Sequence, residues 1–153
     1  MTIKNVTIAG AGVLGSQIAW QAAFHGFNVT VYDVFDKGIE GSKAFHNKFA
    51  ELFKTTRGAS DNEITATFKR LSYTTDLEAA VKDADLVSES VPEKLEIKKS
   101  FYQELAKYAP EKTIFTSNSS TMIPSMYAKE TGRPEKFLAL HFANPVWDAH
   151  IGE

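Results

Sequence analysis

Three closely spaced glycines directly after a short apolar run are the feature that most constrains this chain. The segment Gly10-Ala11-Gly12-Val13-Leu14-Gly15 follows Val6-Thr7-Ile8-Ala9 and leads into residues with helical apolar spacing. In a strand–turn–helix unit, such glycines permit a tight turn, let a pyrophosphate approach the backbone and let the helix pack closely on the strand. The pattern predicts a dinucleotide site, with a ligand-free glycine turn as the alternative. Its expected cofactor contacts are Gly10, Gly12, Val13, Leu14 and Gly15.

An acidic residue at the end of the next apolar run supports the same interpretation. Asp33 closes the run Asn28–Asp33, where a carboxylate accepts hydrogen bonds from the adenosine ribose hydroxyls of a bound dinucleotide. Val34, Phe35 and Asp36 follow, so no arginine stands ready to bind a 2′-phosphate. The sequence therefore predicts NAD rather than NADP as the cofactor.

Short apolar runs alternate with longer amphipathic segments along the rest of the chain. The runs are nearly continuous rather than alternating, which is typical of parallel strands covered on both faces. This order predicts a doubly wound, mostly parallel α/β sheet in one domain spanning residues 1–153. The expected strands are Asn5–Ala9, Asn28–Asp33, Asp85–Glu89, Thr113–Ser117 and Phe137–His141.

Local signals refine the helices between these strands. The segments 60–63 (Ser-Asp-Asn-Glu) and 75–78 (Thr-Asp-Leu-Glu) match the capping box, so helices are expected to begin there and Thr55–Ala59 to form a loop. His46 is expected on a polar helical face, without a function. An apolar stripe at helical spacing is interpreted as core-facing and consists of Phe45, Phe49, Leu52 and Phe53.

Composition excludes several classes of function. The chain carries 17 basic and 19 acidic residues without a basic block, so nucleic acid is not an expected partner. Cysteine is absent, which excludes disulfides and thiolate metal sites, and no metal is predicted. No stretch approaches membrane-spanning length and no signal segment follows Met1, so we expect a soluble, cytoplasmic protein that does not bind membranes.

Three later stretches complete a resemblance to a known family. They are residues 85–98 (Asp-Leu-Val-Ser-Glu-Ser-Val-Pro-Glu-Lys-Leu-Glu-Ile-Lys), 116–121 (Thr-Ser-Asn-Ser-Ser-Thr) and 141–146 (His-Phe-Ala-Asn-Pro-Val). With the glycine segment, they make the chain resemble the NAD-binding Rossmann-type domain of L-3-hydroxyacyl-CoA dehydrogenases along its whole length. The resemblance implies an NAD-dependent oxidoreductase of fatty acid metabolism that interconverts an L-3-hydroxyacyl-CoA and a 3-ketoacyl-CoA.

The resemblance also implies a catalytic set. His141 is expected to move the proton at the C3 oxygen of the substrate, because imidazole titrates near neutral pH. Glu153 is implied as its orienting partner and Ser120 as the group that hydrogen-bonds the C3 oxygen. From the residues alone, a histidine at a strand end such as His141 is more often structural, and the serines before Pro124 would simply cap a helix.

The cofactor contacts implied by the resemblance extend beyond the glycine segment and Asp33. Glu93 and Lys98 are placed near the nicotinamide half of the cofactor, although their charges alone would suggest an exposed ion pair. Glu93 also falls at a strand-to-helix junction, where dinucleotide folds bind ligands. Asn118 and Asn144 complete the expected cofactor contacts.

Two residues depart from the family pattern on the substrate side. Ala143 replaces the second phenylalanine of the usual His-Phe-Phe-Asn-Pro-Val motif, and Trp147 follows where proline is common. The altered pattern is similar to a sub-branch that includes diketoreductases, which reduce ketones not carried on CoA. Ala143 and Trp147 are therefore expected substrate contacts, and a keto ester is the alternative substrate. Lys54 and Arg57 are the basic groups nearest to the family's CoA-binding positions.

The residues after Trp147 resemble the approach to a further element, so the chain is expected to be cut from a longer protein. The resemblance implies that the absent part is a helical C-terminal domain, which supplies a catalytic asparagine and the homodimer interface. A cofactor-binding module without turnover is the remaining alternative.

Overall fold

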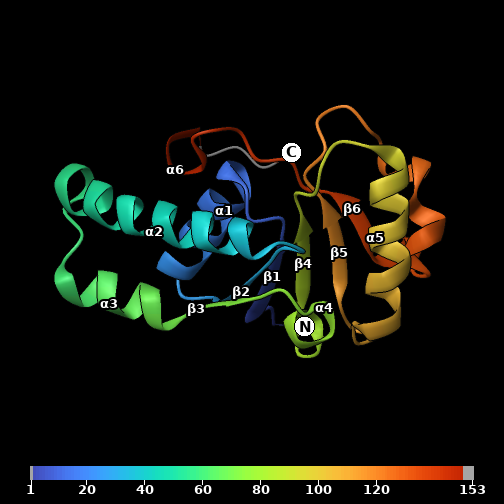
Figure 1. Cartoon of the computed structure of the whole chain (residues 1–153), viewed down its shortest axis with the longest axis horizontal. Helices are drawn as coiled ribbons and strands as arrows, with labels where there is room; N and C mark the ends of the chain where they lie inside the picture. Colours follow the sequence, from blue (N-terminus) through green and yellow to red (C-terminus); the bar gives the residue numbers. More distant parts are fainter. Residues whose placement is uncertain (1, 150–153) are drawn as a thin grey trace.

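The computed structural model describes residues 2–149 as a parallel sheet with helices on both faces (Figure 1). Six strands are hydrogen-bonded in the order β3-β2-β1-β4-β5-β6, and every neighbouring pair is parallel. The predicted doubly wound α/β class is confirmed. The strands are β1 (Asn5–Ala9), β2 (Asn28–Tyr32), β3 (Leu71–Thr74), β4 (Leu86–Glu89), β5 (Ile114–Ser117) and β6 (Phe137–Ala139).

Five of these strands lie where the sequence predicts them, with ends shifted by at most two residues. Asp33, at the end of the predicted second strand, falls just beyond β2. The edge strand β3 was not predicted, because Leu71-Ser72-Tyr73-Thr74 is short and only half-buried and so lacks a continuous apolar run.

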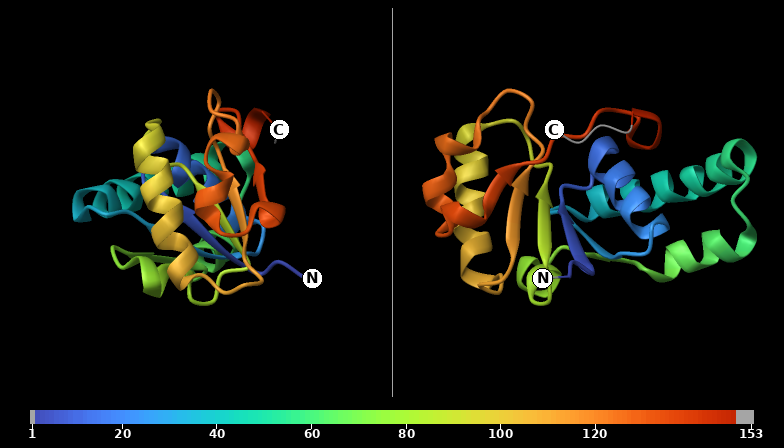
Figure 2. Two further views of the ribbon diagram at one scale, coloured as in Figure 1. Left: turned by 90° about the vertical axis from the view of Figure 1, so that its right-hand side faces the viewer. Right: turned by 180° about the vertical axis from the view of Figure 1, so that it is seen from behind.

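The helices gather toward the two edges of the sheet. Figures 1 and 2 show α1, α2 and α3 gathered near β1 to β3, and α5 beside β5 and β6. The α-helices are α1 (Val13–Phe24), α2 (Asp36–Arg57), α3 (Asp61–Lys69), α4 (Leu77–Val81), α5 (Leu95–Tyr108) and α6 (Val146–Ala149). Three short 3₁₀ turns precede β6, namely η1 (Pro124–Met126), η2 (Ala128–Thr131) and η3 (Pro134–Lys136).

Successive strand residues point to opposite faces and build two separate cores. Ile8 packs in the cluster beneath α1, whereas its neighbour Ala9 packs in the cluster beneath α4 and α5. A third cluster joins α1, α2, α3 and α6 around the fully buried Trp20. The predicted core-facing stripe is confirmed there, since Phe49 and Phe53 are buried and Phe45 and Leu52 pack against them.

The structure corrects three local predictions. Helix α2 continues through Arg57 and ends on Gly58 at a positive φ, so Thr55–Ala59 is not a loop throughout. The capping box at Ser60 and Glu63 is confirmed, but Asp76 rather than Thr75 caps α4. His46 is fully buried instead of lying on a polar face.

A membrane-crossing helix is not found within residues 2–149, because none of these helices is both long and apolar enough. Glu153, predicted to orient His141, lies outside the described residues.

Candidate functional site

The site lies where the strand order reverses, at the carboxyl ends of β1 and β4. The chain leaves β1 toward β2 on one side and leaves β4 toward β5 on the other, and ligands bind in the crevice between such diverging loops. The segment after β6 runs across the strand ends back toward α1 and α2 (Figures 1 and 2). Loops from distant parts of the sequence therefore meet at this edge.

The three glycines after β1 have different surroundings. Gly10 has a φ of +110°, and a Cβ added there would overlap the carbonyl oxygen of Ser90, while one at Gly15 would overlap the carbonyl oxygen of Gly10. These two positions require glycine for close packing within the protein. A Cβ at Gly12 would meet nothing within 4 Å, so the loop presents open space at that position.

The first turn of α1 leaves its amides available above the same loop. Gly12 is the N-cap and offers no side chain to the helix, and the first turn contains no acidic residue. Unpaired amides and the positive end of the helix dipole bind anions such as phosphate. The open space at Gly12 and this uncapped N-terminus therefore fit the pyrophosphate of a dinucleotide.

Asp33 is held directly beside the glycine loop. Its carboxylate accepts hydrogen bonds from the amides of Ala11 at 2.9 Å and Phe35 at 3.0 Å. A Cβ at Gly38 would lie 2.6 Å from the Asp33 carboxyl carbon, so glycine lets α2 approach this side chain. The carboxylate lies at the edge of a cavity of about 830 Å³, whose aromatic walls are Tyr32, Phe35, Phe101 and Tyr108. The cavity fits an adenosine group.

A buried carboxylate that the sequence analysis did not select forms the centre of the β4 side of the site. Glu89, at the end of β4, is 0% exposed and accepts four hydrogen bonds. The donors are Lys98 at 2.7 Å, Val91 N at 2.8 Å, Ser117 at 2.8 Å and Tyr102 at 3.1 Å. Burial, then the neighbouring Glu89 charge, raises the pKa of Tyr102 well above its usual value, so this phenol stays a donor. The available signal for Glu89 was a charged residue at the end of the predicted strand Asp85–Glu89.

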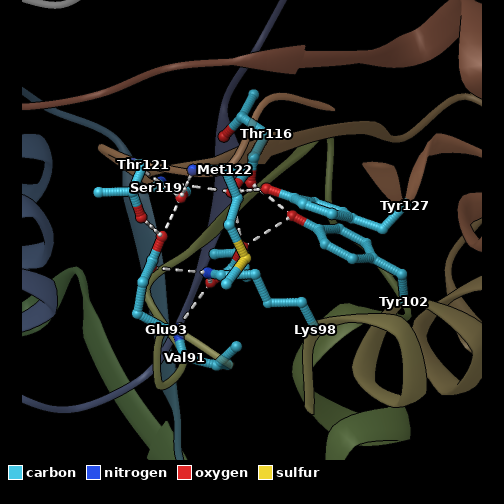
Figure 3. A network of polar contacts seen from close by, with 11 residues as sticks. Val91, Glu93, Lys98, Tyr102, Thr116, Ser119, Thr121, Met122 and Tyr127 are labelled. Carbon is cyan, nitrogen blue, oxygen red and sulfur yellow. Dashed lines mark hydrogen bonds and ion pairs between the residues drawn. The ribbon is translucent and has the colours of Figure 1, made fainter. Parts of the chain in front are cut away.

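Lys98 and Glu93 lie together, but not as the exposed pair that their charges alone suggested. The ammonium of Lys98 is 3.3 Å from Glu93, and its side chain is 1% exposed against 41% for Glu93 (Figure 3). Lys98 also pairs with Glu89, so its ammonium contacts two carboxylates. The predicted contact between Lys98 and the cofactor stays a prediction.

Glu93 is fixed by the loop that follows β5. The hydroxyl of Ser119 donates to Glu93, and so does the hydroxyl of Thr121 at 3.1 Å (Figure 3). Burial alone would raise the pKa of Glu93, but the hydrogen bond from Ser119, the Lys98 charge and the other donors outweigh it and hold the pKa below its usual value. Glu93 is therefore an ionised carboxylate at the crevice.

The serines of this loop do not cap the following 3₁₀ turn. Ile123 is the N-cap of η1 and makes no side-chain cap bond, while Ser119 accepts from the amide of Met122 at 2.9 Å. Ser120 is exposed beside Ser119, on the crevice edge of the sheet.

Two buried amides hold the segment that contains His141. Asn118 accepts a hydrogen bond from the amide of Phe142 at 2.7 Å, directly after the half-buried His141. Gln17 of α1 donates to Asn144 at 2.9 Å and accepts from the amide of Val146 at 3.0 Å. Asn118 and Gln17 thus fix the segment around the histidine, Gln17 partly through Asn144, and Gln17 is a further site residue that the sequence analysis missed.

Trp147 does not face a substrate in this arrangement. It is 6% exposed, and its ring centroid lies 4.8 Å from that of Phe49 and 5.4 Å from that of Phe53. Arg57 donates to the carbonyl oxygen of Trp147 and pairs with Asp148. The expected substrate contact at Trp147 is therefore corrected to a core residue that anchors α6 on α2. Ala143 is half-buried on the same segment.

Comparisons with known proteins agree with this geometry. Residues 5–153 match the family model for the NAD-binding domain of 3-hydroxyacyl-CoA dehydrogenase. The human mitochondrial hydroxyacyl-coenzyme A dehydrogenase is 37% identical over 94% of this chain, which covers 48% of the human protein. The chain spans about half the length of the curated relatives that it matches.

Solved structures show the same fold. A diketoreductase structure, described for its catalysis on dicarbonyl compounds, is 49% identical with a TM-score of 0.94 and covers 99% of this chain and 54% of its own. The 3-hydroxybutyryl-CoA dehydrogenase of Escherichia coli is 32% identical with a TM-score of 0.91, and the match covers 97% of this chain and 31% of that one.

Proposed function

This chain belongs to the 3-hydroxyacyl-CoA dehydrogenase family through its NAD-binding domain, and from this premise we propose that it serves the NAD-dependent interconversion of L-3-hydroxyacyl-CoA and 3-ketoacyl-CoA. The observation that carries the proposal is the position of the Asp33 carboxylate. It lies beside the N-terminus of α1, which has no side-chain cap and has open space at Gly12. The cofactor supplies or accepts the hydride when bound. The protein binds, orients and moves the proton.

Different residues of the site bind different parts of the cofactor. The amides of α1 and the open space at Gly12 receive the pyrophosphate, Asp33 accepts hydrogen bonds from the adenosine ribose, and the aromatic cavity holds the adenine. Glu93 is an ionised acceptor toward the nicotinamide half. Asn118, which holds the segment after β6, and Asn144, which lies on that segment and is bound by Gln17, are the further proposed contacts on that side.

Proton transfer at the C3 oxygen is assigned to His141, with Ser120 as the group that hydrogen-bonds that oxygen. His141 acts as the base in alcohol oxidation and as the acid in ketone reduction. Glu153 is its proposed partner, which would select the tautomer and stabilise the imidazolium.

The test replaces the histidine in the full-length protein. His141→Gln should lower kcat by about a hundredfold to ten-thousandfold, while the affinity for NADH stays within about twofold because the side chain carries no proposed cofactor contact. The matched control is His25→Gln, an exposed histidine beyond the end of α1. A His141→Gln enzyme that keeps more than half of the wild-type kcat would remove the histidine from the mechanism.

A second candidate is the reduction of a dicarbonyl compound that is not carried on CoA. The observation in its favour is that Lys54 pairs with Asp61 and Arg57 with Asp148, so the basic groups nearest to the expected CoA positions already have partners. Steady-state assays with acetoacetyl-CoA and with a free diketo ester separate the two candidates. A kcat/KM at least tenfold higher for the free ester would favour this one.

The remaining contacts are proposed to come from a further helical domain that also forms a homodimer, since the chain spans about half of its relatives. Light scattering on the full-length protein tests the dimer, and a monomeric mass would contradict it. The cytoplasmic location stays a prediction.

A further inference from the structure

Glu89 lies at the junction of three segments around the crevice. It ends β4, binds Lys98 and Tyr102 of α5, and accepts from Ser117 at the end of β5. Ser117 in turn is 2.8 Å from the hydroxyl of Tyr127, beyond η1. Donors surround its carboxylate on both oxygens, so the charge is satisfied without solvent.

The chain of contacts continues from Glu89 to the crevice in one direction. Lys98 bridges the two carboxylates, at 2.7 Å from Glu89 and 3.3 Å from Glu93. Glu93 then binds the hydroxyls of Ser119 and Thr121 (Figure 3). Glu93 thereby ties the loop after β4 to the loop after β5, and Lys98 ties Glu93 to Glu89.

Lys98 would lose half of its partners without Glu89. A buried ammonium with a single, partly exposed carboxylate is poorly compensated, so Lys98 would move toward water and toward Glu93, its remaining counter-ion, and Glu93 would move with it. Removing the Glu89 charge therefore changes the position of a residue that faces the crevice.

We propose that Glu89 is a positioning residue that, through Lys98, sets the place of Glu93 and of the 118–122 loop against the nicotinamide half of the cofactor. The inference rests on the proposed function. It assigns no cofactor contact to Glu89, and it leaves the adenosine half, which Asp33 and the glycine loop are proposed to bind, independent of this chain of contacts.

The experiment compares two ligands that report on the two halves of the site. NADH reaches both halves, whereas ADP reaches only the glycine loop and the adenosine cavity. Glu89→Gln should weaken NADH binding by about tenfold, the equivalent of losing one charged hydrogen-bond arrangement, while ADP affinity stays within about twofold. Loss of both affinities in equal measure would indicate general disruption and overturn the proposal.

A double-variant cycle tests whether Glu89 acts through Lys98. Lys98→Met should cause a similar loss of NADH affinity, and Glu89→Gln combined with Lys98→Met should lose no more than either single variant. The double variant also removes both charges at once, so it is the form to measure if Glu89→Gln fails to fold. Multiplying losses, or NADH affinity within twofold of wild type in the double variant, would overturn the proposal.

The same strand offers a matched control. Asp85, directly before β4, is also a buried carboxylate bound to a lysine, at 2.5 Å from Lys112, but at the opposite end of the sheet. Asp85→Asn should lower the unfolding temperature and leave both affinities unchanged, and a matching NADH loss would overturn the proposal. A wild-type chain that binds ADP but not NADH would contradict the proposed function as well, whereas NADH binding that survives Glu89→Gln would contradict only this inference.

Discussion

His46 and Asp33 are polar residues on or beside α2 whose roles differ because one is buried and the other faces the crevice. His46 lies 2.9 Å through Nε2 from the carbonyl oxygen of Ser16 and 2.6 Å through Nδ1 from the Tyr73 hydroxyl. A carbonyl only accepts, so Nε2 carries the proton and Nδ1 accepts from Tyr73. Burial lowers the pKa of His46 to about 4. His46 is thus a neutral link between α1, α2 and β3.

The lowered pKa of His46 predicts a loss of stability in mild acid. In the unfolded chain His46 binds a proton near pH 6.5, and in the folded chain only near pH 4. The contribution of the neutral, buried His46 to the free energy of unfolding is therefore fully present above pH 6.5 and is lost as the pH falls toward 4. The linked change in the free energy of unfolding is about 3 kcal/mol. Urea unfolding at pH 7.5 and pH 4.5 measures it, with His46→Gln as the comparison. An equally steep loss in His46→Gln would assign the pH dependence to other groups.

Asp33 predicts a strong preference for NADH over NADPH. A 2′-phosphate would face this carboxylate as a like charge at a partly desolvated site, at a cost of several kcal/mol. Calorimetric titration should show the preference in the wild type and a much smaller one in Asp33→Ala. Asp36→Ala, an exposed carboxylate at the start of α2, is the control and should keep the preference. Equal affinities in the wild type would show that Asp33 does not select the ribose.

In the glycine loop, Gly15 and Gly12 have different roles, one in packing and the other in ligand binding. Gly15 has the backbone of Gly10 directly against it, whereas Gly12 has open space and a φ of −72° that alanine adopts without strain. The first therefore serves the packing of α1 on β1, and the second serves the ligand.

A pair of alanine substitutions separates these needs. Gly15→Ala should lower the free energy of unfolding by about 1–3 kcal/mol or more, because the added methyl overlaps backbone that cannot turn away. Gly12→Ala should leave the free energy of unfolding within about 0.5 kcal/mol and still reduce NADH affinity, since the methyl enters the pyrophosphate space. Urea unfolding and NADH fluorescence measure both. Intact NADH affinity in Gly12→Ala would place the phosphates elsewhere.

The whole molecule is closed by contacts between the segment after β6 and the first half of the chain. Gln17 binds Asn144 and the amide of Val146. Trp147 packs on Phe49, and its carbonyl oxygen accepts a hydrogen bond from Arg57. Because the same segment carries His141, packing between these distant parts also positions the proposed catalytic group.

Gln17→Met tests this connection. The variant keeps the size of the side chain but leaves the amide of Val146 without its partner, which should cost about 1–3 kcal/mol of unfolding free energy. In the full-length protein, kcat should fall more than NADH affinity, because the histidine segment loosens while the glycine loop stays intact. Gln103→Met, on the exposed face of α5, is the matched control. Wild-type kcat in a destabilised Gln17→Met enzyme would contradict the connection.

Local patterns in the sequence were sufficient for the fold class and for placing Asp33 beside the glycine loop. Continuous apolar runs, the spacing of the glycines and the position of Asp33 depend on backbone geometry within a few residues, and the structure confirms the strands and the doubly wound class. The edge strand β3 was not predicted because its half-buried residues carry no such pattern.

The burial and the partners of the charged and aromatic side chains depend on how distant parts of the chain pack together. The burial of Lys98 and His46, the central place of Glu89 and the core position of Trp147 arise where helices and strands distant in sequence pack together. The sequence determined which residues could carry charge or proton chemistry. The packing determined which of them are withdrawn from solvent, because burial and hydrogen-bond partners are properties of contacts between elements rather than of the residues themselves.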